Sequence, residues 1–202
     1  MDYDFVEIGS SDYDTLIAES SDNARGITID PIQYYLDRLP NKPNVTKLNV
    51  AISDCEGSVD CYYTPEEIIQ KYVLPPWVRG CNSINNAHPL VCKILQDIQV
   101  TPSDVLKIAT VPKISMKTLL EKYNIGSIQY LKIDTEGHDC TILENYIEAL
   151  KEGITLPAKK ILFECNYLSD KKRVDAVIDQ LQNIGYILIK RDEHDSCLEY
   201  RG

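Results

Sequence analysis

The sequence lacks any apolar run close to the ~20 residues that a membrane-spanning helix requires. Its start lacks the basic and apolar segments of an export signal, because Met1 is followed by the acidic residues Asp2 and Asp4. Low-complexity tracts and internal repeats are also missing. With 202 residues, of which 44% are apolar and 26% charged, residues 1–202 are expected to form a single domain in the cytoplasm.

Basic residues are scarce relative to acidic ones. The chain has 21 Lys and Arg against 31 Asp and Glu, which gives a formal net charge of −10. Nucleic-acid binding draws much of its affinity from contacts between Lys or Arg and phosphates. We therefore expect no nucleic-acid partner and, from the missing apolar run, no membrane partner.

The seven cysteines include no C-x-x-C pair, and their number is odd. This pattern favours reduced, mostly buried thiols over a disulfide framework or a zinc site.

Along the chain, segments with the apolar periodicity of strands alternate with segments that have the apolar periodicity of helices. Strands are predicted at 5–8, 26–31, 48–54, 57–63, 128–134, 159–166, 186–192 and 197–201. Helices are predicted around 32–39, 91–98, 116–123, 143–150 and 174–184. This order predicts a doubly wound, mainly parallel α/β sheet with helices on both faces. We expect 57–63 at an edge and the C-terminal hairpin to form an antiparallel edge.

The segment at about 64–110 interrupts this rhythm and is too long for an ordinary connection. Its stretch PPWVRGCNSINNAHP combines a flat apolar side chain with hydrogen-bonding groups, a mixture that suits a sugar ring. We interpret it as a substrate-binding or lid insertion, although a polar loop anchored by a tryptophan is an equal alternative. The candidate acceptor-binding residues are Trp77, Arg79, Asn82, Asn85, Asn86 and His88.

Acidic residues follow several of the predicted strands, and the carboxyl ends of parallel strands form the ligand crevice in such sheets. Asp30 follows the second strand, where a carboxylate can accept both ribose hydroxyls of a nucleoside. The first loop, from Gly9 to Asp14, has one glycine and two aspartates and not the G-x-G-x-x-G that binds a pyrophosphate. The pattern favours a cationic ligand that contains a ribose.

Four segments carry a resemblance to a known family: VEIGSSDYDT, GITIDP, LNVAISDCEG and, above all, ISMKTLLEKYNIGSIQYLKIDTEGHDCTIL. The chain resembles the FkbM-type branch of class I S-adenosylmethionine-dependent methyltransferases over nearly all its length. The resemblance implies a Rossmann-like, seven-stranded sheet and S-adenosylmethionine as cofactor. The family usually has a second glycine near Tyr13 or Asp14, which this chain lacks.

The resemblance also implies roles for individual residues at the strand ends. Cofactor contacts are implied for Glu7, Gly9 and Ser10 at the methionine end, Asp30 at the ribose, Ser53 and Asp54 at the adenine, and Asp134 at the sulfonium. An ordinary loop carboxylate is the alternative for Glu7 and Asp54, and helix capping is the alternative for Asp30.

Family members mostly methylate hydroxyl groups, commonly on sugars, so a base that removes the hydroxyl proton is expected. The candidates are His138, Glu136 and Glu164, and His138 is favoured by its ordinary pKa. Solvation at a helix start is the alternative for His138 and Asp139. Alternatively, Asp134, Glu164 and Asn166 would bind Mg²⁺, which would acidify the hydroxyl.

The favoured function is therefore O-methylation of a glycan or another hydroxylated small molecule. LPPW has Leu74 where the motif of amino-group methyltransferases needs an amide or an acid, which disfavours N-methylation. Competing functions are a nucleotide- or nucleotide-sugar-binding enzyme and a non-catalytic domain that retains the fold. Related domains also occur fused to glycosyltransferases, including in large DNA viruses, where the location would be the host cytoplasm.

Overall fold

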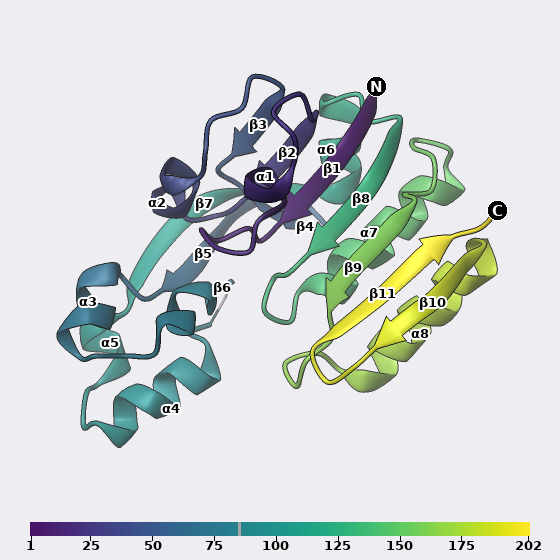
Figure 1. The fold of residues 1–202 in the computed structure, drawn as a ribbon. Coiled ribbons are helices and arrows are strands. Elements are labelled where there is room, and N and C mark those ends of the chain that lie inside the picture. Colours follow the sequence, from purple (N-terminus) through teal and green to yellow (C-terminus); the bar gives the residue numbers. More distant parts are fainter. Residues whose placement is uncertain (85) are drawn as a thin grey trace.

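The computed structural model describes residues 1–84 and 86–202, so the candidate acceptor residue Asn85 lies outside the described residues. Seven strands form the larger of two sheets, in the order β10-β11-β9-β8-β1-β2-β3 (Figure 1). Their bounds are β1 Asp2–Ile8, β2 Gly26–Ile29, β3 Val45–Leu48, β8 Ser127–Ile133, β9 Lys160–Glu164, β10 Tyr186–Arg191 and β11 Asp195–Tyr200. The predicted doubly wound, seven-stranded sheet is confirmed.

The five neighbouring strands β3, β2, β1, β8 and β9 pair in parallel. β11 pairs antiparallel with both β9 and β10. It follows that β10, at the edge, runs parallel to β9. The predicted antiparallel C-terminal hairpin at the sheet edge is confirmed, and its second strand, β11, lies between β9 and β10.

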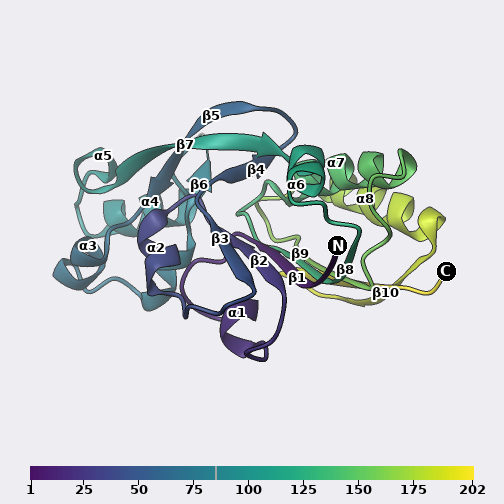
Figure 2. The same ribbon diagram turned by 90° about the horizontal axis from the view of Figure 1, so that it is seen from above.

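Helices cover one face of this sheet with a continuous layer (Figure 2). This layer consists of α6 Met116–Lys122, α7 Asp139–Lys151 and α8 Lys171–Ile184. Ser115 caps α6 by accepting a hydrogen bond from Thr118 N, and Gly185, at φ 117°, ends α8. The other face carries the short helix α1 Leu16–Glu19, with α2 Gln33–Arg38 beside it.

The main core lies between the sheet and α6–α8. Val6, Leu131 and Phe163 are fully buried there, because successive side chains in a strand alternate between the two faces. Burial of each such side chain contributes about 1.5–3 kcal/mol. This packing holds the carboxyl ends of β1, β8 and β9 in a fixed register.

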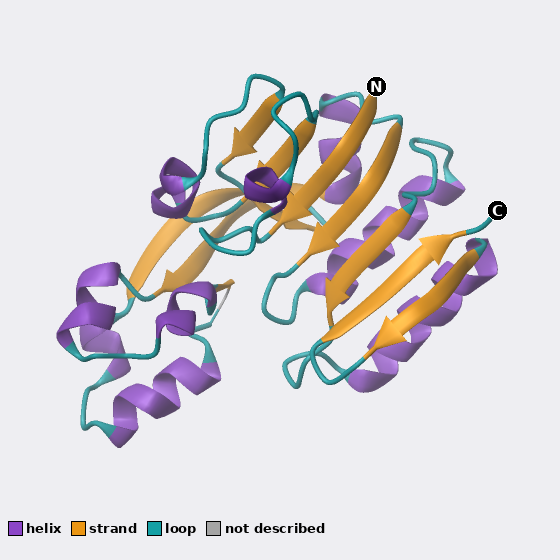
Figure 3. Cartoon of the chain, in the orientation of Figure 1, coloured by secondary structure: helices purple, strands orange, loops and turns teal. Residues whose placement is uncertain are grey.

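A second sheet lies beside the first, and its long pair β5 and β7 is visible in Figure 3. Its order is β4-β7-β5-β6, with bounds β4 Ala51–Ser53, β5 Gly57–Tyr63, β6 Ser83–Ile84 and β7 Lys107–Ser115. The expectation that 57–63 lies at an edge is wrong, since β5 pairs with β7 on one side and β6 on the other.

The predicted single strand at 48–54 is in fact two strands in different sheets. Between β3 and β4, Asn49 Nδ2 donates to the carbonyl oxygens of Asp30 (3.1 Å) and Pro31 (2.8 Å). These bonds hold the chain where it leaves the first sheet, after which β4 pairs with β7.

The segment at 64–110 forms a small helical unit with its own apolar core. Its helices are α3 Glu66–Lys71, the 3-10 helix η1 Pro76–Gly80, α4 Pro89–Asp97 and α5 Pro102–Val105. Val78, Val91 and Leu95 are buried among them. Among the described residues, no helix has the length and apolar character needed to cross a membrane.

All seven cysteines are free thiols, as predicted, but Cys61 and Cys140 alone are buried. The expectation of mostly buried thiols is wrong, because several cysteines lie in loops and at strand ends.

Candidate active site

A cavity opens where the carboxyl ends of β1, β2 and β8 meet. It encloses about 500 Å³, including the open space at its mouth. Of the predicted cofactor residues, Gly9, Asp30 and Asp134 line it. Apolar residues at and just before β4 also line it, namely Val50, Ala51 and Ile52, together with Ile84 of β6.

Gly9 lies where β1 turns into the first loop. Its φ is +80°, and a Cβ at this position would lie 1.7 Å from the carbonyl oxygen of Asp134. The close approach brings the ends of β1 and β8 together beneath the cavity. Only glycine fits here, because any side chain would overlap the neighbouring backbone.

Asp30 presents a buried carboxylate at the end of β2. Its Oδ2 accepts from Ser11 N at 2.8 Å, and its Oδ1 accepts from Ile32 N at 2.7 Å. Burial raises the pKa of Asp30 to about 7, although these two hydrogen bonds favour the ionised form. The carboxylate is held rigidly between the first loop and the start of α2.

The acids nearest the first loop are compensated by basic residues. Asp12 forms ion pairs with Arg38 at 2.5 Å and with Arg79 at 3.6 Å. Glu7 is fully buried, accepts from Leu16 N, and lies 3.3 Å from Lys132 Nζ. Glu7 therefore lies behind the loop, where it holds α1.

Uncompensated negative charge lies instead at the ends of β8 and β9. Among the described residues, no Lys or Arg lies within ion-pairing distance (4.0 Å) of Asp134 or Glu164. Asp134 is solvent-exposed, but desolvation by the surrounding protein and the charges of Asp139 and Glu136 raise its pKa to about 7. Burial and the neighbouring carboxylates hold the pKa of Glu164 well above its usual range. The site favours a bound cation.

Asp139 is fully buried in the first turn of α7. It accepts from Thr135 Oγ1 at 2.8 Å and from Glu164 N at 3.1 Å. Burial raises its pKa to about 6. Its position ties the loop after β8 to the end of β9, and it is not solvated as the sequence alternative supposed.

His138 lines the same cavity as Asp30, and its contact with Ser53 joins the two sheets. Its Nε2 lies 2.9 Å from Ser53 Oγ, and Ser53 Oγ donates to Asp54 Oδ1 at 3.0 Å. With the single hydrogen of the Ser53 hydroxyl directed to Asp54, Nε2 of His138 donates to Ser53 Oγ, and Nδ1 is bare in the neutral ring. Burial lowers the pKa of His138, which favours this neutral form.

A second cavity of about 350 Å³ adjoins the first. Four residues line both cavities, so they form the wall between them: Gly9, Ser11, Gly80 and Asp134. Ser10, Tyr13 and Glu136 line the second cavity alone. Catalytic candidates therefore lie on both sides of one partition, His138 in the first cavity and Glu136 in the second.

The predicted acceptor residues are dispersed around these cavities. Asn82 lines the first cavity, and Trp77 on η1 is 41% exposed. Arg79 pairs with Asp12 and lies over the ring of Tyr13. His88 is buried, with its Nε2 3.2 Å from Glu136 Oε2.

The proposed magnesium ligands do not all direct oxygens to one point. Asn166 Nδ2 donates to Glu164 Oε1 at 2.6 Å, while Asn166 Oδ1 accepts from Leu168 N at 2.8 Å. These bonds fix the amide so that Asn166 presents a donor to Glu164. An Mg²⁺ ion needs oxygen ligands, so this arrangement does not fit the set.

Sequence reasoning missed two tyrosines that flank the acidic group. Tyr13 is 45% exposed and Tyr167 is 67% exposed. The charge of Glu136 contributes to a raised pKa for both, and burial contributes most; that of Tyr13 reaches about 12. A single tyrosine in a polar loop of the sequence does not by itself indicate a functional site.

The strand order, the parallel register and the crevice at the strand ends define the class I methyltransferase fold. Residues 5–188 match the family model described as the methyltransferase FkbM domain, and the chain belongs to this family. A search of curated proteins finds no match. Among solved structures, a putative rRNA-methylase from Clostridium thermocellum shares 10% identity and a TM-score of 0.44, over 98% of this chain and 86% of that one.

Proposed function

We propose that the protein is an S-adenosylmethionine-dependent O-methyltransferase that acts on a hydroxyl of a sugar or similar small molecule. The observation that supports this most is the first cavity, which places Asp30 and Asp134 on either side of Gly9. Asp30 would bind the ribose hydroxyls, and the apolar wall at Val50–Ile52 would contact the adenine.

The charge at the strand ends fits this cofactor. When bound, S-adenosylmethionine supplies a methyl group activated by a positively charged sulfur. Asp134 would lie beside this charge, and Lys132 does not compete for Asp134 because it pairs with Glu7. The missing pyrophosphate loop argues against a dinucleotide.

His138 is the residue that would take the proton of the acceptor hydroxyl. Its bare Nδ1 would accept the proton that the acceptor hydroxyl gives up when it is methylated. Ser53 and Asp54 would orient the ring and stabilise the imidazolium. Exposed aromatic surfaces at Trp77 and Tyr13 would contact a sugar ring.

Calorimetric titration with S-adenosylhomocysteine and, separately, with NAD tests the cofactor. Binding of the first and not of the second is expected. Methyl transfer to a panel of rhamnose-, fucose- and hexose-containing acceptors then tests the reaction. Tight NAD binding would favour a nucleotide-binding enzyme, and cofactor binding without turnover on any acceptor would favour a non-catalytic domain.

Replacing Asp30 with Asn is expected to weaken S-adenosylhomocysteine binding by roughly 10–100-fold, because hydrogen bonds to a charged group contribute about 1.5–3 kcal/mol. Calorimetry measures the change. Asp22→Asn, at an exposed position in the loop before β2, is the matched control and should bind like the parent. Unchanged affinity in Asp30→Asn would contradict the assigned ribose contact.

Cofactor affinity is also expected to fall below pH 7. The pKa of Asp30 is raised to about 7 in the ligand-free protein, so acid protonates the carboxylate that the ribose hydroxyls require. Well below pH 7, affinity should fall by about tenfold per pH unit from this group. The ionisable groups facing it are Asp12, Glu7, Tyr35 and Cys61. Asp30→Asn should show a shallower slope, and an equal slope would contradict the assignment.

A further inference from the structure

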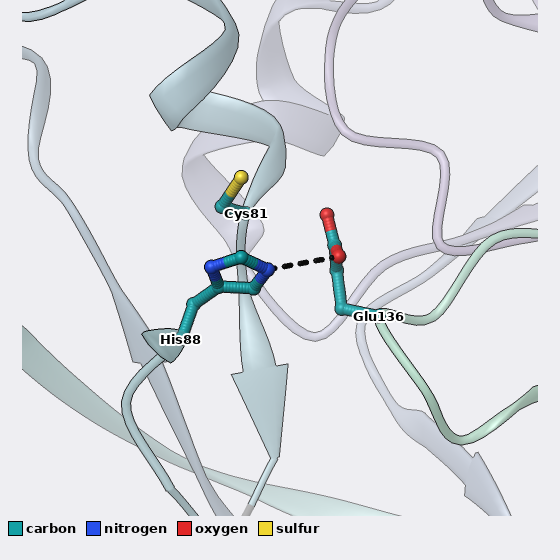
Figure 4. A group of neighbouring side chains, drawn as sticks. All are labelled: Cys81, His88 and Glu136. Carbon is teal, nitrogen blue, oxygen red and sulfur yellow. Dashed lines mark hydrogen bonds and ion pairs between the residues drawn. The ribbon is translucent and has the colours of Figure 1, made fainter. Parts of the chain in front are cut away.

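Three potential metal ligands from two distant parts of the chain meet beside the second cavity. Cys81 follows η1, His88 precedes α4, and Glu136 lies in the loop between β8 and α7. Their ligand atoms, Sγ, a ring nitrogen and a carboxylate oxygen, all lie within 4.8 Å of one another. Figure 4 shows the three side chains gathered at this junction.

One pair of these atoms has the spacing found around a tetrahedral ion. Ligand atoms about 2.1 Å from a tetrahedral zinc ion lie about 3.4 Å apart. His88 Nε2 and Glu136 Oε2 are 3.2 Å apart in the structure. The sulfur of Cys81 lies within 4.8 Å of a ring nitrogen of His88 and a carboxylate oxygen of Glu136.

The chemical types of these three ligands favour one class of metal. A thiolate and an imidazole suit zinc and similar transition metals, whereas Mg²⁺ and Ca²⁺ prefer oxygen ligands throughout. Three protein ligands also leave a fourth position free, as in zinc sites that bind water or substrate. The set therefore differs in both residues and metal from the oxygen set at Asp134, Glu164 and Asn166.

Burial and charge favour an ion at this place. His88 is 3% exposed, and its side chain has no hydrogen-bond partner at Nδ1 among the described residues. Glu164 lies close to Glu136, and its Oε2 is a buried oxygen that also lacks a partner among those residues. A divalent cation would offset the repulsion between these groups.

We propose that Cys81, His88 and Glu136 bind a divalent transition-metal ion of the zinc class. The ion joins the helical unit at 64–110 to the loop after β8, so it fixes the wall of the second cavity against the end of the main sheet. The sequence did not indicate this site, because it has no C-x-x-C pair and the three ligands come from separate segments. The inference stands independently of the proposed methyl transfer.

Titration of the metal-free, reduced protein with Co²⁺ tests the site. One equivalent of Co²⁺ should produce the near-ultraviolet charge-transfer absorption of a cobalt–thiolate bond, which Zn²⁺ removes by displacement and Mg²⁺ does not. Cys81→Ser should lose this absorption. Cys92→Ser, a half-buried thiol in α4, is the matched control and should retain it.

His88→Ala and Glu136→Gln should each weaken Co²⁺ binding by roughly tenfold or more. No charge-transfer absorption in the parent protein, or its persistence in Cys81→Ser, would overturn the proposal. If Cys81→Ser does not fold, unchanged Co²⁺ affinity in Glu136→Gln would overturn it as well. S-adenosylhomocysteine binding, measured separately on the metal-free protein, shows whether the cofactor proposal fails independently.

Discussion

Replacing His138 with Ala is expected to slow methyl transfer by roughly 10²–10⁴-fold, the usual contribution of a general base. Ser53 Oγ lies 2.9 Å from Nε2 of His138, which leaves Nδ1 as the ring nitrogen that can accept the proton. The affinity for S-adenosylhomocysteine should change by less than about threefold, since Asp30 and the apolar wall remain. Steady-state kinetics and calorimetry on the same preparation separate the two effects.

His194→Ala is the matched control for this experiment, because His194 is exposed in the turn between β10 and β11. It should retain full turnover. Ser53→Ala should give a smaller loss than His138→Ala, since the ring would remain but lose its orientation. Turnover of His138→Ala close to that of the parent would remove His138 from the mechanism and leave Glu136 or Glu164 as the base.

Gly9→Ala is expected to have the largest effect on stability. The new Cβ would lie 1.7 Å from the carbonyl oxygen of Asp134, so the ends of β1 and β8 must separate. A residue with a side chain also pays roughly 1–2 kcal/mol for the left-handed backbone. A total loss above about 3 kcal/mol lowers the melting temperature by about 6–12 °C in a chain of this size.

Gly153→Ala separates the two contributions. Gly153 also has a positive φ, +72°, but a Cβ there would meet nothing within 4 Å. This variant should lose about 1–2 kcal/mol from the backbone alone. Thermal unfolding followed by circular dichroism compares the two variants. Equal losses of unfolding free energy would show that the contact with Asp134 does not contribute to stability.

Much of the main sheet could be predicted because its strands are consecutive apolar runs with clear boundaries. The stretch from Ser115 to Asp134 contains a capped helix, a turn and a buried strand in order, and the structure has each of them. β7 was missed because Pro112 interrupts its pattern and most of its side chains are exposed or half-buried. The segment forms a strand because it pairs with β4 and β5.

The strand-end residues could be located from sequence, but their partners could not. Asp30 and Asp134 follow apolar strands and are visible as such. The contact of Ser53 with His138 joins residues 85 positions apart, and the partners of Asp12 come from α2 and η1. Such pairs depend on how the second sheet packs, which local patterns do not encode. The sequence therefore overstated the free negative charge of the first loop.

Gly9 and Gly80 both belong to the wall that the two cavities share, together with Ser11 and Asp134. Gly9 arrives from the main sheet and Gly80 from the helical unit, where a Cβ would lie 2.4 Å from the hydroxyl of Tyr13. A side chain at either glycine would therefore intrude on both chambers at once, so neither chamber can be reshaped at these positions without the other.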